Sequence, residues 1–246
     1  MRSNGRATAS NEHQVDPPVI VLIIPAQNEE ASIGMVVSEL PPELLRDVIV
    51  VDNGSTDSTA DAARAAGATV LSEPRTGYGW ACMRGIDYLA QNPPDVVVFM
   101  DGDRSDYPSD LPAVVRPIVD GEADLVIGSR TIGGRERGAL LPQAVVGNRF
   151  ACAVIRAVSG VQFTDLGPFR AIRYSDLVAL DLQEMRYGWT VEMQIKAVKS
   201  GLRCVEVPVS YRKRIGRSKV TGTVSGTIKA SARILWVLAR YAFGRG

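Results

Sequence analysis

Short apolar runs, rich in β-branched residues, alternate with amphipathic stretches along the first half of the chain. Continuous apolarity over so few residues is typical of strands buried on both faces of a largely parallel sheet. The stretches between them have helical periodicity, with Gly, Pro or Asn marking the turns. The alternation predicts an α/β fold with a Rossmann-like, doubly wound, mostly parallel sheet flanked by helices. The predicted strands are Val19–Ile24, Val48–Val51, Ala68–Leu71, Val96–Met100 and Leu125–Ile127, and the predicted helices are Glu30–Leu40, Ser58–Ala66, Gly79–Ala90 and Asp110–Val119.

Polar clusters follow four of these predicted strands. Ligands of doubly wound sheets bind beyond the carboxyl ends of the strands. Carboxylates crowded at one sheet edge repel one another and lose hydration, so a purely structural arrangement would reduce stability. We therefore expect a cation or a hydrogen-bonding ligand at this edge. The clusters are Pro25–Glu30, Asp52–Asp57, Asp101–Asp106 and Gly128–Arg130.

Asp101 and Asp103 are separated by one residue, so both carboxylates can point to the same side of an extended strand end. Two hard oxygen ligands, completed by water and a diphosphate, are a usual way to hold Mg²⁺ or Mn²⁺. An isolated Asp-x-Asp is more often a turn cap beside a solvated aspartate. The preceding strand and the neighbouring clusters favour the metal site.

Asp52 and Asn53 supply carboxylate and amide groups for hydrogen bonds to a base or a ribose, whereas a helix cap alone would explain Ser55–Asp57. No Gly-x-Gly-x-x-Gly follows the first predicted strand, and no Walker-type Gly-Lys-Ser/Thr occurs. Their absence counts against a dinucleotide enzyme and against a P-loop phosphotransferase.

Composition narrows the class further. The chain has 246 residues, 46% of them hydrophobic, which suits one large domain. A formal net charge of +1 gives no reason to expect a nucleic-acid partner. The cysteines Cys82, Cys152 and Cys204 are widely spaced among apolar or small neighbours, as reduced thiols of a cytosolic protein are.

The N-terminal stretch 1–16 is polar and aperiodic, so we expect a disordered tail. It holds the sole histidine, His13, and histidine chemistry is therefore not expected. The tail lacks the apolar core of a signal peptide, and no run reaches the ~20 apolar residues that cross a bilayer. We expect a cytoplasmic protein that does not span the membrane.

In their order along the chain, the four clusters resemble the family 2 glycosyltransferases of the GT-A fold. The matching segments are Pro25–Glu29, Val51–Ser55, Asp101–Asp103 and Gly128–Arg130. Within that family the resemblance is closest to the dolichol- or polyprenyl-phosphate sugar synthases and their bacterial relatives. This narrower likeness rests on Thr164–Arg170, Gly188–Met193 and Arg212–Lys219, and a GT-A domain over 17–219 is expected.

The resemblance implies a role for each matching residue. Ser105 stands where these synthases often present a glutamine ligand to the metal, so the implied ligands are Asp101, Asp103 and Ser105. Gln27 and Asn53 depart from the residues common in the family, which leaves the choice of guanine or uracil open. The implied nucleotide-sugar-binding residues are Pro25, Gln27, Glu29, Val51, Asp52, Asn53, Asp101, Gly102, Asp103, Arg130, Lys213, Arg214 and Lys219.

The expected acceptor is a polyprenyl phosphate, which is already ionised and needs no general base. Displacement at the anomeric carbon would then be inverting. A hydroxyl acceptor would need a base, for which Asp165 and Glu192 are the candidates. Alternatively, Asp165 caps a turn and Glu192 lies on a solvent face. The cations considered for the acceptor phosphate are Arg149, Arg156, Arg170 and Arg217. Arg149 and Arg156 share one predicted helix, Pro142–Val158, and exposure to solvent would explain these two equally well.

A C-terminal amphipathic helix is expected within 220–246, where Gly226–Phe243 combines an aromatic-rich apolar face with several cations. Such a helix suits the surface of an anionic membrane, and a helix packed on the domain explains the pattern equally well.

Three other functions compete with the synthase. They are a transferase acting on a hydroxyl acceptor, a non-catalytic nucleotide-sugar-binding protein and a metal-dependent nucleotidyltransferase. The joint presence of Asp101, Asp103 and Arg130 counts against the non-catalytic protein.

Overall fold

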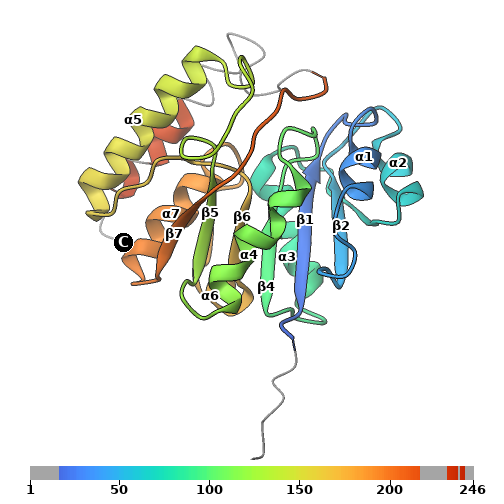
Figure 1. Cartoon of the computed structure of the whole chain (residues 1–246), viewed down its shortest axis with the longest axis horizontal. Helices are drawn as coiled ribbons and strands as arrows, with labels where there is room; N and C mark the ends of the chain where they lie inside the picture. Colours follow the sequence, from blue (N-terminus) through green and yellow to red (C-terminus); the bar gives the residue numbers. More distant parts are fainter. Residues whose placement is uncertain (1–16, 217–231, 238, 242–246) are drawn as a thin grey trace, which may run out of the picture.

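A computed structural model describes residues 17–216, 232–237 and 239–241. These residues form a seven-stranded sheet in the order β3-β2-β1-β4-β6-β5-β7, with helices on both faces (Figure 1). The sheet is parallel except for β6, which runs antiparallel to both β4 and β5. The strands are β1 Ile20–Ala26, β2 Asp47–Asp52, β3 Thr69–Ser72, β4 Val96–Phe99, β5 Leu125–Ser129, β6 Arg170–Arg173 and β7 Cys204–Pro208.

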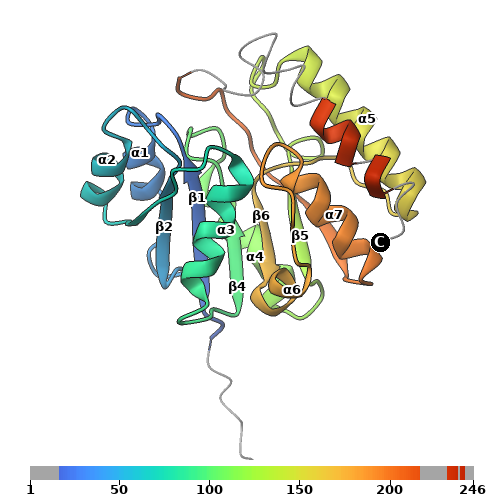
Figure 2. The same cartoon turned by 180° about the vertical axis from the view of Figure 1, so that it is seen from behind.

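The helices divide between the two faces of the sheet, as Figures 1 and 2 show from opposite sides. One face carries α1, α2 and α4, and the other carries α3, α6 and α7, with α5 beside α7. The helices are α1 Ile33–Ser38, α2 Thr59–Ala65, α3 Tyr78–Leu89, α4 Leu111–Val119, α5 Pro142–Ser159, α6 Tyr174–Ala179 and α7 Trp189–Lys199, with a short 3₁₀ turn at Pro108–Asp110.

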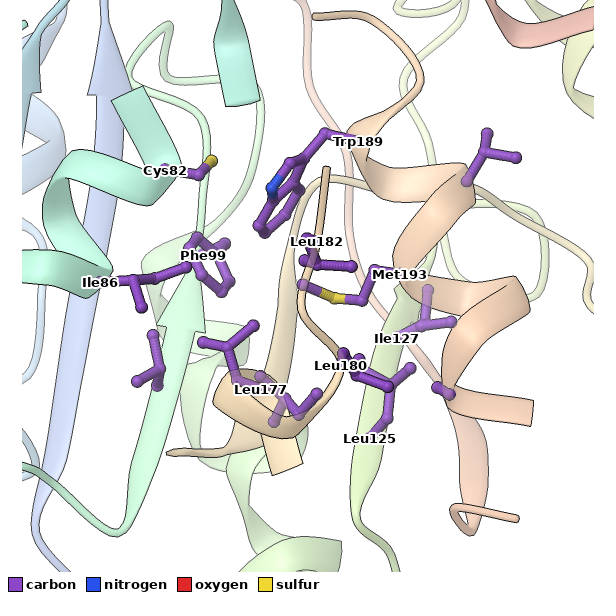
Figure 3. Packing of buried hydrophobic residues seen from close by; sticks show 14 of the residues in the cluster. Cys82, Ile86, Phe99, Leu125, Ile127, Leu177, Leu180, Leu182, Trp189 and Met193 are labelled. Carbon is purple, nitrogen blue, oxygen red and sulfur yellow. The ribbon is translucent and has the colours of Figure 1, made fainter. Parts of the chain in front are cut away.

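The central strands β1, β4 and β5 bury both of their faces. In β1, Leu22 and Ile24 pack into the core beneath α1 and α4, whereas Val21 and Ile23 pack into the core beneath α3 and α7. Trp189 lies at the centre of this second core, with its ring 4.8 Å from that of Phe99 (Figure 3). Burial on both faces explains why these central strands are predominantly apolar instead of alternating.

The five predicted strands and four predicted helices of the first half are confirmed, with boundary differences of at most three residues. The doubly wound, mostly parallel sheet is also confirmed. The sequence did not predict β6, β7, α6 or α7. Cys82 and Cys152 are buried free thiols and Cys204 is a half-buried one, as expected.

Segment 1–16, predicted as a tail, lies outside the described residues. So do residues 217–231, 238 and 242–246, which include the start of the predicted C-terminal helix. Over the described ranges, none of the helices is both long and apolar enough to cross a bilayer.

Candidate active site

A cavity of about 400 Å³ opens at the carboxyl edge of β1, β2 and β4. The parallel register aligns these strand ends, since Ala26 of β1 pairs with Asp52 of β2. Later segments close the other sides. The described lining residues are Pro25, Ala26, Gln27, Glu29, Asn53, Thr76, Gly77, Tyr78, Asp101, Gly102, Asp103, Arg130, Leu166, Pro168, Arg186, Tyr187, Thr190, Arg214 and Ile234.

The turn after β1 is braced against the turn after β2. Asn28 adopts a left-handed conformation with φ 52°, and its backbone N–H donates to the Ser55 hydroxyl at 2.9 Å. In return, Thr56 N–H donates to Asn28 Oδ1 at 2.7 Å, and Glu29 N–H donates to the Thr59 hydroxyl at 2.7 Å. Short polar side chains that tolerate left-handed geometry suit such a turn. The bracing holds Gln27 and Glu29 at the cavity.

Asn53 builds the wall beside β2. Its amide Nδ2 donates to the carbonyls of Glu73 (3.0 Å) and Arg75 (2.8 Å), and its Oδ1 accepts from Gly77 N–H at 2.8 Å. The side chain therefore fixes the segment that leads into α3. An aspartate could not make the two donated bonds, so asparagine at this position has a structural reason.

Two residues predicted for the nucleoside pocket do not line the cavity. Val51 lies inside β2 and is fully buried in the core beneath α3 and α7. Asp52 accepts a hydrogen bond from Ser55 N–H at 3.0 Å and so stabilises the turn after β2. Neither residue is among the side chains that the structure brings to the cavity wall.

Asp101 and Asp103 both line the cavity, with Gly102 between them. Burial, together with the negative charge of Asp103, raises the pKa of Asp101 to about 7. Gly102 lies close to Ile33 and Ile24, so a side chain there would crowd the core below the turn. Two crowded carboxylates facing one cavity are a donor set that suits Mg²⁺ or Mn²⁺.

The rest of the predicted metal shell differs. Ser105 is fully buried and donates its hydroxyl to Asp103 Oδ1, so it orients that carboxylate and does not face the cavity. Among the described residues, no group of three or more His, Cys, Asp or Glu side chains is arranged to hold a metal ion. The protein therefore offers two carboxylates from this turn, and diphosphate and water oxygens would complete the coordination.

Asp106 is a third carboxyl group beside this pair, and the sequence did not single it out. It is buried, and its Oδ1 has no hydrogen-bond partner within the described structure. Burial and the charges of Asp101 and Asp103 raise its pKa well above the usual value.

Arg130 lies at the cavity in a bidentate ion pair with Asp165. Its Nε donates to Asp165 Oδ2 at 2.7 Å and its Nη2 to Oδ1 at 2.7 Å, while its backbone N–H also donates to Oδ2 at 2.8 Å. Burial disfavours the Asp165 carboxylate, but the charge and hydrogen bonds of Arg130 outweigh burial and lower its pKa. Asp165, predicted as a candidate general base, does not line the cavity and lies behind Arg130.

The loop 211–216 lies across the aspartate turn. Arg212 N–H donates to Ser105 O at 2.9 Å and Ile215 N–H to Asp103 O at 3.0 Å. Arg214 lines the cavity and forms an ion pair with Asp103. Lys213 is exposed and does not line the cavity, contrary to expectation. The predicted Arg217 and Lys219 lie outside the described residues.

Arg170 and Glu192 are buried and do not line the cavity. The Arg170 guanidinium donates to the carbonyls of Gly167 and Thr190, so it cannot reach an acceptor. Glu192 accepts from the backbone N–H groups of Gln183 (2.9 Å) and Glu184 (2.6 Å), so it is neither a base at the cavity nor a solvated side chain. Both predicted roles are wrong in this structure, because the two charges serve to satisfy buried backbone groups.

Arg149 and Arg156 are exposed on α5 and do not line the cavity, so the structure supports the solvent-exposed alternative for both.

The sequence missed two segments of the cavity wall. Thr76, Gly77 and Tyr78 come from the start of α3, where Gly77 and Gly79 let the loop around Met185 approach the backbone closely. The two glycines at the start of this helix were the available signal. Arg186 and Tyr187 come from the loop before α7, which has no periodic pattern and gave no signal.

Comparisons with known proteins agree with this geometry. The profile of Glycosyl transferase family 2 matches residues 21–173. An uncharacterized glycosyltransferase of Mycobacterium tuberculosis is 36% identical over 213 residues, which cover 86% of this chain and 94% of the relative. The undecaprenyl-phosphate mannosyltransferase of Micrococcus luteus is 32% identical over 219 residues, covering 84% of this chain and 89% of the relative.

Among solved structures, the chain resembles glucosyl-3-phosphoglycerate synthase of M. tuberculosis in complex with Mn²⁺, UDP-glucose and phosphoglyceric acid. The TM-score is 0.73 and the sequence identity 25%, and the match covers 92% of this chain and 80% of that chain.

Proposed function

Since the chain belongs to glycosyl transferase family 2, we propose that it is an inverting enzyme that moves a sugar from a nucleoside diphosphate to the phosphate of a polyprenyl phosphate. One observation carries the proposal: the cavity holds the carboxylates Asp101 and Asp103 together with the guanidinium groups of Arg130, Arg186 and Arg214. Carboxylates for a divalent ion beside cations for phosphates suit a diphosphate donor and a phosphate acceptor. The undecaprenyl-phosphate mannosyltransferase relative agrees with this acceptor class.

The donor would lie along the strand ends. Gln27, Asn53 and Gly77 form the wall available to the nucleoside. Arg130 and Arg214 face the position expected for the diphosphate. Asp101 and Asp103 would hold Mg²⁺ or Mn²⁺, which supplies positive charge to the diphosphate as the nucleoside diphosphate departs.

The site suits a nucleophile that arrives ionised. Asp165 is paired with Arg130 and Glu192 is buried against a loop, so neither is placed to take a proton from a hydroxyl acceptor. A phosphate oxygen needs no such base. The protein would then contribute positioning and electrostatic stabilisation of the leaving group.

A lipid acceptor requires the enzyme to work at a membrane surface, and we place it on the cytoplasmic side. Leu235 and Trp236 of the C-terminal helix are 46% and 47% exposed. The guanidinium groups of Arg233 and Arg240 lie 4.3 and 5.6 Å from the Trp236 ring. Apolar and cationic side chains together suit the interface of an anionic bilayer.

The test is transfer from radiolabelled UDP- and GDP-sugars with Mn²⁺, offering undecaprenyl phosphate or 3-phosphoglycerate as acceptor. We expect label in an organic-soluble, mild-acid-labile product. Label only in glucosyl-phosphoglycerate-like, water-soluble product would reject the lipid acceptor. Absence of transfer from every donor would instead favour the non-catalytic nucleotide-sugar-binding protein.

The matched variants are Asp103→Asn and Asp61→Asn. Asp103→Asn removes one of the two cavity carboxylates, so we expect roughly a hundredfold or greater loss of transfer and weaker Mn²⁺ binding by calorimetry. Asp61 lies on α2 with an 83% exposed side chain, and its pair with Arg64 contributes little to stability. Asp61→Asn should behave as the wild type. Full activity and unchanged Mn²⁺ binding in Asp103→Asn would contradict the proposed site.

A further inference from the structure

We infer that Arg186 binds the phosphate group of the acceptor, an inference that rests on the proposed function. Arg186 is solvent-accessible and lines the cavity from the loop between α6 and α7. The motifs at the strand ends do not predict the position of Arg186 at the cavity or the loop that carries it.

Arg186 differs from the other cavity arginines in its pairing. Arg130 is held by both oxygens of Asp165, and Arg214 is paired with Asp103. Over the ranges that the structure describes, no carboxylate pairs with the Arg186 guanidinium. A guanidinium that no described carboxylate engages has its donors available for two parallel hydrogen bonds to a phosphate.

The loop that carries Arg186 is fixed from below. The buried carboxylate of Glu192 accepts from the N–H groups of Gln183 and Glu184, as described above. The buried Glu184 carboxylate accepts from Arg186 N–H at 3.0 Å and pairs with Arg233 at 2.6 Å. Two buried acids therefore hold the backbone on the N-terminal side of Arg186, which a solvated surface loop would not require.

The loop is also fixed from the side. The Met185 carbonyl lies against Gly77 and accepts a hydrogen bond from Trp80 N–H at 3.3 Å. On the other side of Arg186, Gly188 lies against Val237 of the C-terminal helix, where a side chain at position 188 would clash. The loop and the start of α3 thus form one wall, and Arg186 extends from it beside Tyr187.

The surroundings of Arg186 also suit the chain that follows a lipid phosphate. Leu166, Pro168 and Ile234 line the same cavity. Ile234 comes from the helix whose outer face exposes Leu235 and Trp236. A phosphate bound by Arg186 would therefore leave an attached isoprene chain near apolar side chains and near the expected membrane surface.

The test compares Arg186→Gln and Arg186→Lys with Arg116→Gln. Arg116 is an 80% exposed arginine on α4 and serves as the matched control. Binding of geranyl phosphate to the protein loaded with Mn²⁺ and nucleoside diphosphate is measured by calorimetry, with geraniol as the probe lacking phosphate. Steady-state KM values are measured for undecaprenyl phosphate, 3-phosphoglycerate and the donor.

We expect Arg186→Gln to weaken geranyl phosphate binding and to raise the KM for undecaprenyl phosphate by about tenfold or more. The donor KM and nucleotide binding should change less than about twofold, and Arg186→Lys should recover part of the loss because it keeps the charge but not the fork. Arg116→Gln should match the wild type.

Three results separate the possibilities. If Arg186→Gln weakens nucleotide binding as much as acceptor binding, Arg186 serves the donor diphosphate and the inference is wrong. Unchanged geranyl phosphate binding would also overturn it, while transfer by the wild type would leave the proposed function intact. If only 3-phosphoglycerate depends on Arg186, the phosphate site stands, but the lipid source of the phosphate is rejected.

Discussion

Arg130 and Asp165 are joined by two side-chain hydrogen bonds and one from the Arg130 backbone. Arg130 is 13% exposed and Asp165 is 1% exposed, so only the arginine reaches the cavity. The fork geometry fixes the guanidinium plane as well as its position. We therefore expect Asp165 to be a positioning residue, whose effect on the reaction acts through Arg130.

Replacing Asp165 with Asn separates this role from that of a general base. We expect Asp165→Asn to lose one of the two charged bonds, to raise the donor KM and to lower kcat/KM by roughly 10- to 100-fold. The pH dependence of kcat/KM should keep the shape seen for the wild type, because no proton transfer is removed. Disappearance of the acidic limb in Asp165→Asn alone, with Asp61→Asn unchanged, would instead identify Asp165 as a base.

More of the residues predicted for the nucleotide sugar line the cavity than of those predicted for the acceptor. Asp101, Asp103, Arg130 and Arg214 line the cavity as the sequence indicated. Arg170 did not, because the sequence does not show that its guanidinium is used by buried carbonyls. Charged residues are rarely fully buried, so a position at the surface was the reasonable expectation.

At the scale of elements, the reversed strand β6 is what separates this sheet from the regular alternation of the first half. It lies between β4 and β5, with Phe99 paired to Arg170 and Leu125 to Ile172. The strand is four residues long with an arginine at each end. Neither apolarity nor period-2 alternation marked it, so its place depends on tertiary contacts that the local pattern does not contain.

Asp124 ties the edge of this reversed region together. Its Oδ1 accepts from Arg203 Nη2 at 2.6 Å and its Oδ2 from Arg203 Nε at 3.0 Å, and it also pairs with Arg173 at 3.3 Å. The hydrogen bonds from Arg203 lower the pKa of Asp124 well below its usual value, against a smaller effect of burial. These contacts link β5 with β6 and with the segment before β7.

Asp124→Asn should lower the free energy of unfolding by about 1 kcal/mol at pH 7, since Arg203 is partly exposed and the bonds are screened. A carboxyl group with a lowered pKa in the folded state stabilises the fold above its unfolded pKa of about 3.9 and loses that effect as the pH falls through the folded pKa. The difference between wild type and variant should therefore be constant from pH 5 to 8 and shrink below about pH 4. Urea unfolding over this range measures it.

The control is Asp120→Asn, which removes a pair with the 80% exposed Arg116. That variant should differ from the wild type by less than about 0.5 kcal/mol at each pH. An Asp124→Asn difference that grows on acidification would contradict the assigned sign.

For the molecule as a whole, the described part of the C-terminal helix connects the cavity with the outer surface. On its inner face, Arg233 pairs with Glu184, and the Tyr241 hydroxyl donates to Glu192 at 2.6 Å. Val237 is buried in the core and Ile234 lines the cavity. Figure 2 shows this helix beside α5. Although it is distant in sequence from the strand ends, its Ile234 lines the same cavity.

The inner face of the helix packs on the domain, as one of the two alternatives predicted, and the membrane surface stays a proposal for its exposed outer face. The pattern of apolar and cationic residues predicted an amphipathic helix but could not divide the apolar residues between the core and the exterior, because Ile234 and Leu235 are chemically alike. The division depends on which residues meet Gly188 and the loop before α7.

The outer face supplies the final prediction. Replacing both Leu235 and Trp236 with Ser should reduce partition into vesicles containing phosphatidylglycerol by roughly tenfold or more. An apolar side chain contributes about 1.5–3 kcal/mol when it is fully buried, and these two would be partly buried in the bilayer surface. Val178→Ser is the matched control, because Val178 is 52% exposed on α6, away from the cavity. Cosedimentation measures partition, and transfer to soluble geranyl phosphate checks that the cavity is intact. Equal partition of the wild type and the double variant would reject the outer face as the membrane contact. Loss of partition with retained transfer would show that the two faces of one helix serve the bilayer and the cavity separately.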